Sequence, residues 1–294
     1  MEDVIKYFCK KYQFKQDGIE YLSESFIKLK ENKQAHEIFC EKVRLYEENY
    51  RFEVEPVFTE IEALEAICGI HKYTLDLLYL IALTPHLKQL YLEHGLSEEI
   101  YDDSVCDVKW KAYEGKELFG FYGTFVGQWT IGFFRLERFA MGRLQYDLQP
   151  FAEDTQLDNV TFKKGDTFIN VHIPSSGPLI YSDCQKSYAR AADFYKDHFK
   201  NQPIVFGCTS WMMSPNNKKI LPETSNVIKF MNDYTVIKAE LNNTWDLWRI
   251  FKVFDLPENV YDLPQETSMQ RAFVKWLAEG NLINIAFAIK LYHE

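Results

Sequence analysis

Thr167-Phe-Ile-Asn-Val-His-Ile-Pro-Ser-Ser-Gly-Pro-Leu179 is the stretch that carries most information about the fold. Its first seven residues suit a strand, in which Asn170 and His172 point to one face and the intervening apolar residues to the other. Pro174 ends this strand, because proline has no N–H to donate to a central ladder. The segment therefore predicts a sheet strand that stops abruptly at a loop.

The residues after this strand are small and precede a predicted helix. Ser175, Ser176 and Gly177 form the loop, and Ser182 is a good N-cap for the helix that follows. Backbone N–H groups at such a loop and the helix dipole together favour a phosphate. The same residues also fit a tight connection without a ligand, and spacing alone leaves both interpretations open.

Short runs further along the chain predict additional strands, and helical segments lie between them. The strands are expected at Leu144–Leu148, Thr167–Ile173, Pro203–Trp211, Tyr234–Leu241 and Ile285–Leu291. The helices are expected near Asp183–Phe199, Ser225–Asp233 and Ser268–Glu279. Alternation of strands and helices predicts a sheet domain flanked by helices, over residues 138–294.

The first half of the chain, residues 1–137, has a helical pattern instead. Apolar residues recur at steps of three and four, as at Ile19, Leu22, Phe26 and Leu29. We expect the helix around residues 75–83 to end at Thr84-Pro85, because a proline disfavours helix in the residue before it. The fold class is therefore α+β, a helical N-terminal domain followed by a mixed-sheet domain.

Composition and charge limit the classes of partner. The chain has 294 residues, of which 47% are hydrophobic and 26% charged, a balance typical of globular proteins. It carries 33 Lys and Arg against 43 Asp and Glu, a formal net charge of −10. Nucleic-acid-binding proteins are normally basic, so we expect no nucleic acid as a partner.

The cysteines and the apolar runs indicate a compartment. Six cysteines are scattered without a C-x-x-C pair, which is typical of reduced thiols. The N-terminus lacks the pattern of a signal peptide, and the longest apolar run, Leu77–Leu83, is too short to span a bilayer. We therefore expect a cytoplasmic protein with no membrane partner.

Common catalytic and metal-binding motifs are absent from the sequence. It contains no G-x-x-x-x-G-K-[ST], G-x-G-x-x-G, G-x-S-x-G or H-E-x-x-H. The histidines other than His172 show no ligand spacing with Cys, Asp or Glu, so no metal is expected.

Two residues in the predicted strands are candidates for chemistry. His172, near a strand end, suits a general base, although a sheet histidine bonded to Asn170 or to a loop carbonyl is the structural alternative. Cys208 suits a nucleophile only if His172 lies beside it, and it is otherwise an inert buried thiol.

Several separated motifs in the second half follow one another in a familiar order. They include Gly142–Tyr146 (GRLQY), Val171–Pro174 (VHIP), Ser187–Ala191 (SYARA), Cys208–Trp211 (CTSW) and Leu263–Ala272 (LPQETSMQRA). In these motifs the sequence resembles a family of bacterial proteins with a GNAT-like acyltransferase C-terminal domain and a helical N-terminal domain. The resemblance covers roughly residues 130–290, with a looser match in the helical half.

The resemblance implies a mixed sheet flanked by helices, and transfer of an acyl group from acetyl-CoA or another acyl-CoA to an amine. On this basis Ser175, Ser176 and Gly177 would hold the cofactor phosphates, and His172 would take the amine proton. Tyr234 would reprotonate the departing thiolate.

The pyrophosphate signature common in that fold, Gln/Arg-x-x-Gly-x-Gly/Ala, is replaced here by Pro-Ser-Ser-Gly-Pro-Leu. The alternative is thus a non-catalytic GNAT-like binding or scaffold protein. Expected partners are a small-molecule or amine substrate, and the sequence leaves a homo-oligomer open.

Overall fold

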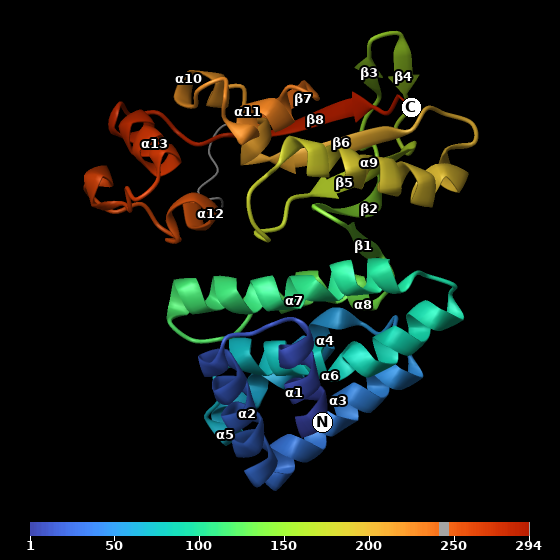
Figure 1. Cartoon of the computed structure of the whole chain (residues 1–294), viewed down its shortest axis with the longest axis vertical. Coiled ribbons are helices and arrows are strands. Elements are labelled where there is room, and N and C mark those ends of the chain that lie inside the picture. Colours follow the sequence, from blue (N-terminus) through green and yellow to red (C-terminus); the bar gives the residue numbers. More distant parts are fainter. Residues whose placement is uncertain (241–246, 294) are drawn as a thin grey trace. The chain divides into compact units, whose positions relative to one another are not determined.

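The computed structural model describes residues 1–240 and 247–293. The chain divides into two compact units, Met1–Ala140 and Met141–Glu294, each of which is described by itself. The elements of both are labelled in Figure 1.

The first unit is helical. Its helices are α1 (Glu2–Lys11), α2 (Gln16–Glu31), α3 (Lys33–Glu48), α4 (Val54–Ala63), α5 (Glu65–Cys68), α6 (Lys72–Glu93), α7 (Glu98–Phe119) and α8 (Gly127–Phe134). α6 is the central element and packs against α1, α2, α3, α4, α7 and α8. Since it is covered from several sides, most of its residues from Thr74 to Tyr91 are buried. The predicted helical N-terminal domain is confirmed.

The expected end of a helix at Thr84-Pro85 is wrong, because α6 continues through Pro85 to Glu93. Proline removes the N–H that would bond the carbonyl four residues earlier, here that of Ile81. The Thr84 hydroxyl donates to Ile81 O instead, at 2.7 Å. This side-chain bond and the burial of the helix let the proline be accommodated without a break.

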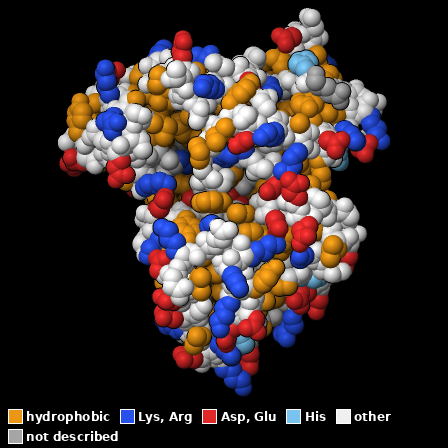
Figure 2. All heavy atoms as spheres, viewed as in Figure 1, with side chains coloured by type: hydrophobic (Ala, Val, Ile, Leu, Met, Phe, Trp, Pro, Cys, Tyr) orange, Lys and Arg blue, Asp and Glu red, His pale blue; other side chains and the backbone are white. Residues whose placement is uncertain are grey.

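Charged side chains of both signs are intermixed on the face of the molecule in Figure 2, and no region of that face carries one sign alone. Among the described residues, no helix is both long enough and apolar enough to cross a bilayer.

The second unit is built on a mixed sheet. Its strand order is β1-β2-β5-β6-β8-β7, and β3 and β4 pair separately as a small hairpin. β5 and β6 are parallel, whereas β2–β5, β6–β8 and β7–β8 are antiparallel. The bounds are β1 (Arg138–Met141), β2 (Leu144–Pro150), β3 (Thr155–Leu157), β4 (Val160–Phe162), β5 (Thr167–His172), β6 (Val205–Ser210), β7 (Thr235–Glu240) and β8 (Ile285–Leu291).

The five predicted strands correspond to β2, β5, β6, β7 and β8. The predicted strand Tyr234–Leu241 begins one residue before β7, and Leu241 lies outside the described residues. The short strands β1, β3 and β4 were not predicted, because three or four residues are too few to show an alternating pattern.

The helices of this unit are α9 (Tyr181–Tyr195), α10 (Asn217–Ile220), α11 (Asn226–Met231), α12 (Leu247–Phe251) and α13 (Ser268–Ala278), with single 3₁₀ turns at Lys196–Phe199, Trp211–Met213 and Val260–Asp262. α9 is the crossover between the parallel strands β5 and β6. It packs on one face of the sheet, where Tyr146 Oη donates to Ser187 Oγ at 2.8 Å.

Candidate functional site

The carboxyl ends of the parallel strands β5 and β6 form the first part of the candidate site. Their pairing register joins Ile169 to Phe206 and Asn170 to Gly207, and both strands continue beyond these pairs. β6 remains paired to β8 on its other side as far as Ser210. Pairing between β5 and β6 therefore stops before their carboxyl ends, the position at which sheets of this kind bind ligands.

The loop that follows β5 is held by Arg143, which lies in the turn just before β2. Arg143 donates from Nη1 to Pro174 O at 3.0 Å, from Nη2 to Gly177 O at 2.9 Å and from Nε to Pro178 O at 3.0 Å. Gly177 has a φ of +123°, a conformation that side chains other than hydrogen rarely adopt. The predicted Ser175–Gly177 loop is thus a defined turn with a cation on one side.

The N-terminus of α9 opens directly after this loop. The predicted cap at Ser182 is wrong, because Ile180 is the N-cap and makes no side-chain cap bond. The Ile180 carbonyl already accepts from the N–H groups of Asp183 and Cys184 at 3.1 Å, so the helix begins earlier and places Ser182 in its first turn. A helix start without a side-chain cap is a position at which the N–H groups before Asp183 can meet an anion, although Asp183 places a carboxylate in the same turn.

A polar cluster lies on the face of the sheet opposite α9. Asp147 on β2 directly faces Asn170 on β5, and His172 is two residues further along. His172 Nε2 lies 3.1 Å from Asp147 Oδ2, and Asn170 Nδ2 donates to Asp147 Oδ1 at 2.9 Å. The His172 side chain is 24% exposed and that of Asp147 is 8% exposed.

Two side chains meet Nε2 of His172. Asn170 Nδ2 lies 3.1 Å from it, as Asp147 Oδ2 does, and the amide nitrogen donates hydrogen bonds whereas the carboxylate accepts them. The contacts of Nε2 therefore fit either tautomer of the ring, and the buried carboxylate beside it would stabilise an imidazolium, as in a His–Asp pair of hydrolases. The contact with Asn170 is the structural alternative for His172, and its role as a general base stays a prediction, with Asp147 as the orienting partner.

Asp147 and Arg143 are the site residues that the sequence alone did not identify. Asp147 lies within the predicted strand Leu144–Leu148, and its contact with His172 depends on the register between β2 and β5. Arg143 belongs to the GRLQY motif, but its three carbonyl partners lie 31 to 35 residues further along the chain.

Tyr234 lies on the other face of the sheet. Its hydroxyl is 2.7 Å from that of Tyr188 on α9, and the Tyr188 ring packs on Phe206. Phe206 in turn contacts Tyr146, whose strand neighbour Asp147 points to the opposite face. The structure does not bring Tyr234 together with His172, and burial raises the pKa of Tyr234 well above its ordinary value.

Cys208 shares the face of Tyr234 rather than that of His172. It alternates with Gly207 along β6 and lies on the side of Phe206 and Tyr188. The thiol is 1% exposed, and burial raises its pKa to about 12. A thiol of this kind is protonated at neutral pH, and the structure does not bring Cys208 together with His172.

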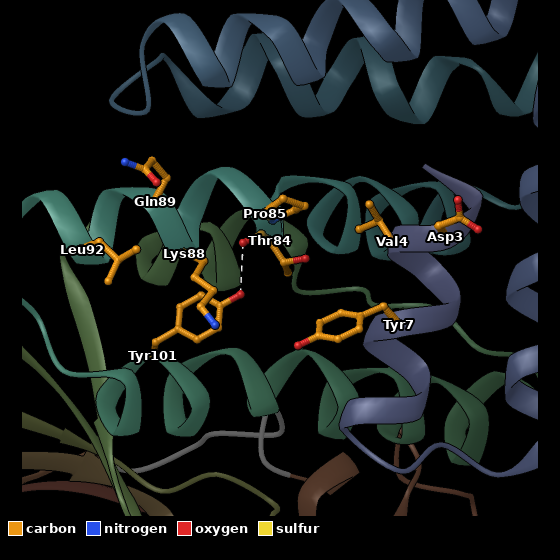
Figure 3. Close-up of a pocket in the computed structure, with 9 residues that line it drawn as sticks. All are labelled: Asp3, Val4, Tyr7, Thr84, Pro85, Lys88, Gln89, Leu92 and Tyr101. Atoms are coloured by element: carbon orange, nitrogen blue, oxygen red, sulfur yellow. Dashed lines mark hydrogen bonds between the residues drawn. The ribbon is translucent and has the colours of Figure 1, made fainter.

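The helical unit contains a cavity of about 460 Å³ between α1, α6 and α7, shown in Figure 3. Tyr101 Oη donates to Thr84 O at 3.0 Å along its wall, and Lys88 at its edge pairs with Glu98 at 2.8 Å. Its lining is mainly apolar, so it offers surface contacts rather than a base or a nucleophile. Within the described ranges, no group of His, Cys, Asp and Glu is arranged to hold a metal ion.

Two family models together match almost the whole sequence. The N-acyltransferase N-terminal domain matches residues 3–136, and the GNAT-like C-terminal domain matches residues 138–287. None of the proteins with curated functions matches the sequence.

Solved structures share the architecture at low sequence identity. A crystal structure of an acyltransferase in complex with decanoyl-CoA and teicoplanin is 17% identical, with a TM-score of 0.64, and the alignment covers 98% of this chain and 99% of that one. A mutant acyltransferase in complex with octanoyl-CoA gives the same identity, TM-score and coverage. A structure with decanoyl-CoA alone is 16% identical, with a TM-score of 0.62 over 97% of this chain and 98% of that one.

Proposed function

This chain belongs to the family that joins an N-acyltransferase N-terminal domain to a GNAT-like C-terminal domain, and we propose that it is an acyl-CoA-dependent N-acyltransferase. The observation that carries the proposal is the His172–Asp147 pair, which stands at the carboxyl end of β5 immediately before the loop and the open start of α9. A proton acceptor and an anion-binding turn are thereby linked by a few residues of backbone.

The loop after β5 and the N-terminus of α9 are proposed to bind the phosphates of CoA. The amides of Ser175, Ser176 and Gly177 and the first turn of α9 would donate to the pyrophosphate, which the helix dipole also favours. The pantetheine arm would lie between the carboxyl ends of β5 and β6, because the backbone N–H and C=O groups there lie beyond the last paired residues. The two amides of pantetheine would form hydrogen bonds with these groups, as a neighbouring strand would.

His172 is proposed to take the proton from the amine. Bound acyl-CoA supplies a thioester carbonyl, at which the amine nitrogen forms a C–N bond while the C–S bond breaks. The His172 ring accepts the proton that the nitrogen loses and returns it to the CoA sulfur. The proposal gives Tyr234 no proton to carry, since its hydroxyl is bonded to that of Tyr188 on the other face.

The acceptor and donor are proposed by class. The net charge of −10 favours an amine that is cationic in solution, such as an amino group on a small molecule, which releases one proton to solvent before its neutral nitrogen attacks. Since the similar structures hold decanoyl-CoA and octanoyl-CoA, medium-chain donors are the first to test beside acetyl-CoA. All six cysteines are free, which supports a reducing, cytoplasmic setting.

The alternative is a non-catalytic binding protein of the same fold. The absence of the common pyrophosphate signature favours it, because Pro-Ser-Ser-Gly-Pro-Leu stands in that place. A binding protein needs no proton acceptor, and in it His172 would be a sheet histidine bonded to Asn170 and Asp147.

The experiment is an acyl-transfer assay that follows release of the CoA thiol, with acetyl-, octanoyl- and decanoyl-CoA against a panel of primary amines. We expect amine-dependent thiol release that His172→Gln lowers by on the order of 10²-fold, the usual contribution of a general base. CoA binding without turnover on any amine would favour the binding protein. Full activity of His172→Gln would remove His172 from the chemistry.

A further inference from the structure

The turn that carries Arg143 is rigidly defined. Gly142 and Arg143 connect β1 to β2 in two residues, and Gly142 has a φ of +79°. Two-residue turns with glycine at a positive φ are a standard connection between strands. Arg143 thus projects from a short turn rather than from a long loop, and the fixed turn aims it at the segment Pro174–Pro178.

All three nitrogens of the guanidinium are used on that segment. They donate to three different carbonyl oxygens, those of Pro174, Gly177 and Pro178, at 2.9 to 3.0 Å. Only a planar fork with donors in several directions makes this arrangement; an ammonium is a compact point charge on a flexible stem. Arg143 is therefore bound to both ends of the loop at once.

The orientation of these carbonyls determines that of the neighbouring amides. In a trans peptide the N–H points opposite to the C=O, and no cis peptide occurs among the described residues. Since the carbonyls of Pro174 and Pro178 point to Arg143, the N–H groups of Ser175 and Leu179 point away from it. The Gly177 carbonyl precedes Pro178, which has no N–H, so that contact costs the loop no donor.

The charge of Arg143 adds to this effect. Its hydrogen-bond partners in the described part of the chain are neutral carbonyl oxygens, and the carboxylate of Asp183 also acts on it and raises the pKa of Arg143 against the effect of burial. Burial lowers the pKa of Arg143 from its ordinary value, and an arginine still remains protonated in proteins. The loop thus has a cation on its inner side.

We propose that Arg143 is the positioning residue of the pyrophosphate subsite: it binds the carbonyls of Pro174, Gly177 and Pro178 and so fixes the loop against which the CoA pyrophosphate lies. This inference rests on the proposed function. It also explains how a loop without the common Gln/Arg-x-x-Gly-x-Gly/Ala signature holds a phosphate, because the rigidity comes from a side chain on another strand instead of from the loop's own glycines.

The test compares two acyl donors that differ only beyond the pantetheine. S-decanoyl-CoA has the pyrophosphate, and S-decanoyl-pantetheine lacks it. Arg143→Gln is expected to raise KM for the CoA thioester at least tenfold with kcat nearly unchanged, and to change KM for the pantetheine thioester less than twofold. Arg143→Lys, which keeps the charge but not the fork, is expected to recover only part of the loss.

Arg271→Gln is the matched control. Arg271 Nη1 also donates to two loop carbonyls of the same unit, those of Gln265 and Glu266, at 2.8 and 2.9 Å. We expect it to leave both KM values unchanged. If Arg143→Gln does not fold, Arg143→Lys carries the same comparison.

An unchanged KM for decanoyl-CoA in the folded Arg143 variants would overturn the assignment, as would an equal rise for both donors. These outcomes differ from failure of the proposed function, in which the wild-type protein uses neither thioester.

Discussion

His172 Nε2 and Asp147 Oδ2 lie 3.1 Å apart on the strands β5 and β2, as diagonal rather than direct partners in the antiparallel register. Asp147 faces Asn170 directly, and that asparagine donates to its second oxygen at 2.9 Å. Asn170 Nδ2 also lies 3.1 Å from His172 Nε2, so the three side chains form one polar network.

Asp147→Asn tests whether this network matters for turnover. An amide in place of the carboxylate removes the charge that stabilises the imidazolium, so we expect kcat to fall on the order of 10²-fold. KM for the acyl-CoA and the melting temperature should change little. Asp193→Asn is the control, because that carboxylate is exposed and pairs only with Lys196 in the described structure. Equal kcat values for the two variants would show that Asp147 has no part in the reaction.

Tyr234→Phe tests whether Tyr234 contributes to stability alone or also to the reaction proposed on the other face of the sheet. The hydroxyl bonds that of buried Tyr188 at 2.7 Å, so its loss leaves a buried donor without its partner. We expect the free energy of unfolding to fall by about 1–3 kcal/mol while kcat stays within about twofold of wild type. Denaturant titration and the transfer assay measure the two quantities. A large fall in kcat in a stable variant would return Tyr234 to the role of proton donor.

The hydroxyl of Thr84 is predicted to offset the missing N–H of Pro85. Thr84→Val should lower the free energy of unfolding by about 1–3 kcal/mol, because the Ile81 carbonyl loses its donor. The same change should cost less in a Pro85→Ala background, since an alanine N–H at position 85 bonds that carbonyl. A double-mutant cycle by denaturant titration gives the interaction free energy between positions 84 and 85. A value of zero would refute this explanation.

The buried carboxyl of Asp76 predicts a pH dependence of stability. Asp76 is 2% exposed, and burial, with a smaller contribution from Glu62, raises its pKa well above the ordinary value, whereas Lys72 opposes this. The folded protein thus binds a proton that the unfolded chain releases above about pH 4, so stability falls as pH rises beyond that point.

In Asp76→Asn the side chain at position 76 does not titrate, so the variant should lack this fall in stability with rising pH. The difference in the free energy of unfolding between wild type and variant, measured from pH 4 to pH 8, should change in favour of the variant as pH rises, by at most about 1.4 kcal/mol per unit. Parallel pH curves would show that the carboxyl is ionised in the folded state. Asp193→Asn is again a suitable control, since its carboxylate is exposed.

Local patterns predicted the secondary structure where the elements are long and amphipathic. α2 shows this, since Leu22, Phe26 and Leu29 recur on one face and are buried. β5 and β8 show it equally, because alternation within one strand reports which side chains share a face. The break expected at Pro85 failed because a neighbouring hydroxyl and the packing of α6 override the local effect of proline.

The site depends on relations that no single segment contains. His172 and the Ser175–Gly177 loop were found because strand, loop and helix follow one another in sequence. Asp147 reaches His172 only through the register of β2 on β5, and Arg143 reaches Pro174 and Gly177 only through the sheet order. One sequence read alone does not specify which strands are neighbours, so these partners required the fold.

The most direct test of the central claim is a thermal-shift titration of the purified protein with CoA, acetyl-CoA and decanoyl-CoA up to millimolar concentration. A ligand that binds the folded state stabilises it by about 2.7 kcal/mol at one hundred times its Kd. We predict a saturable rise in melting temperature with at least one acyl-CoA, and its loss in Gly177→Trp, which puts a bulky side chain into the turn at a φ of +123°. No shift with any CoA species would contradict the acyltransferase assignment.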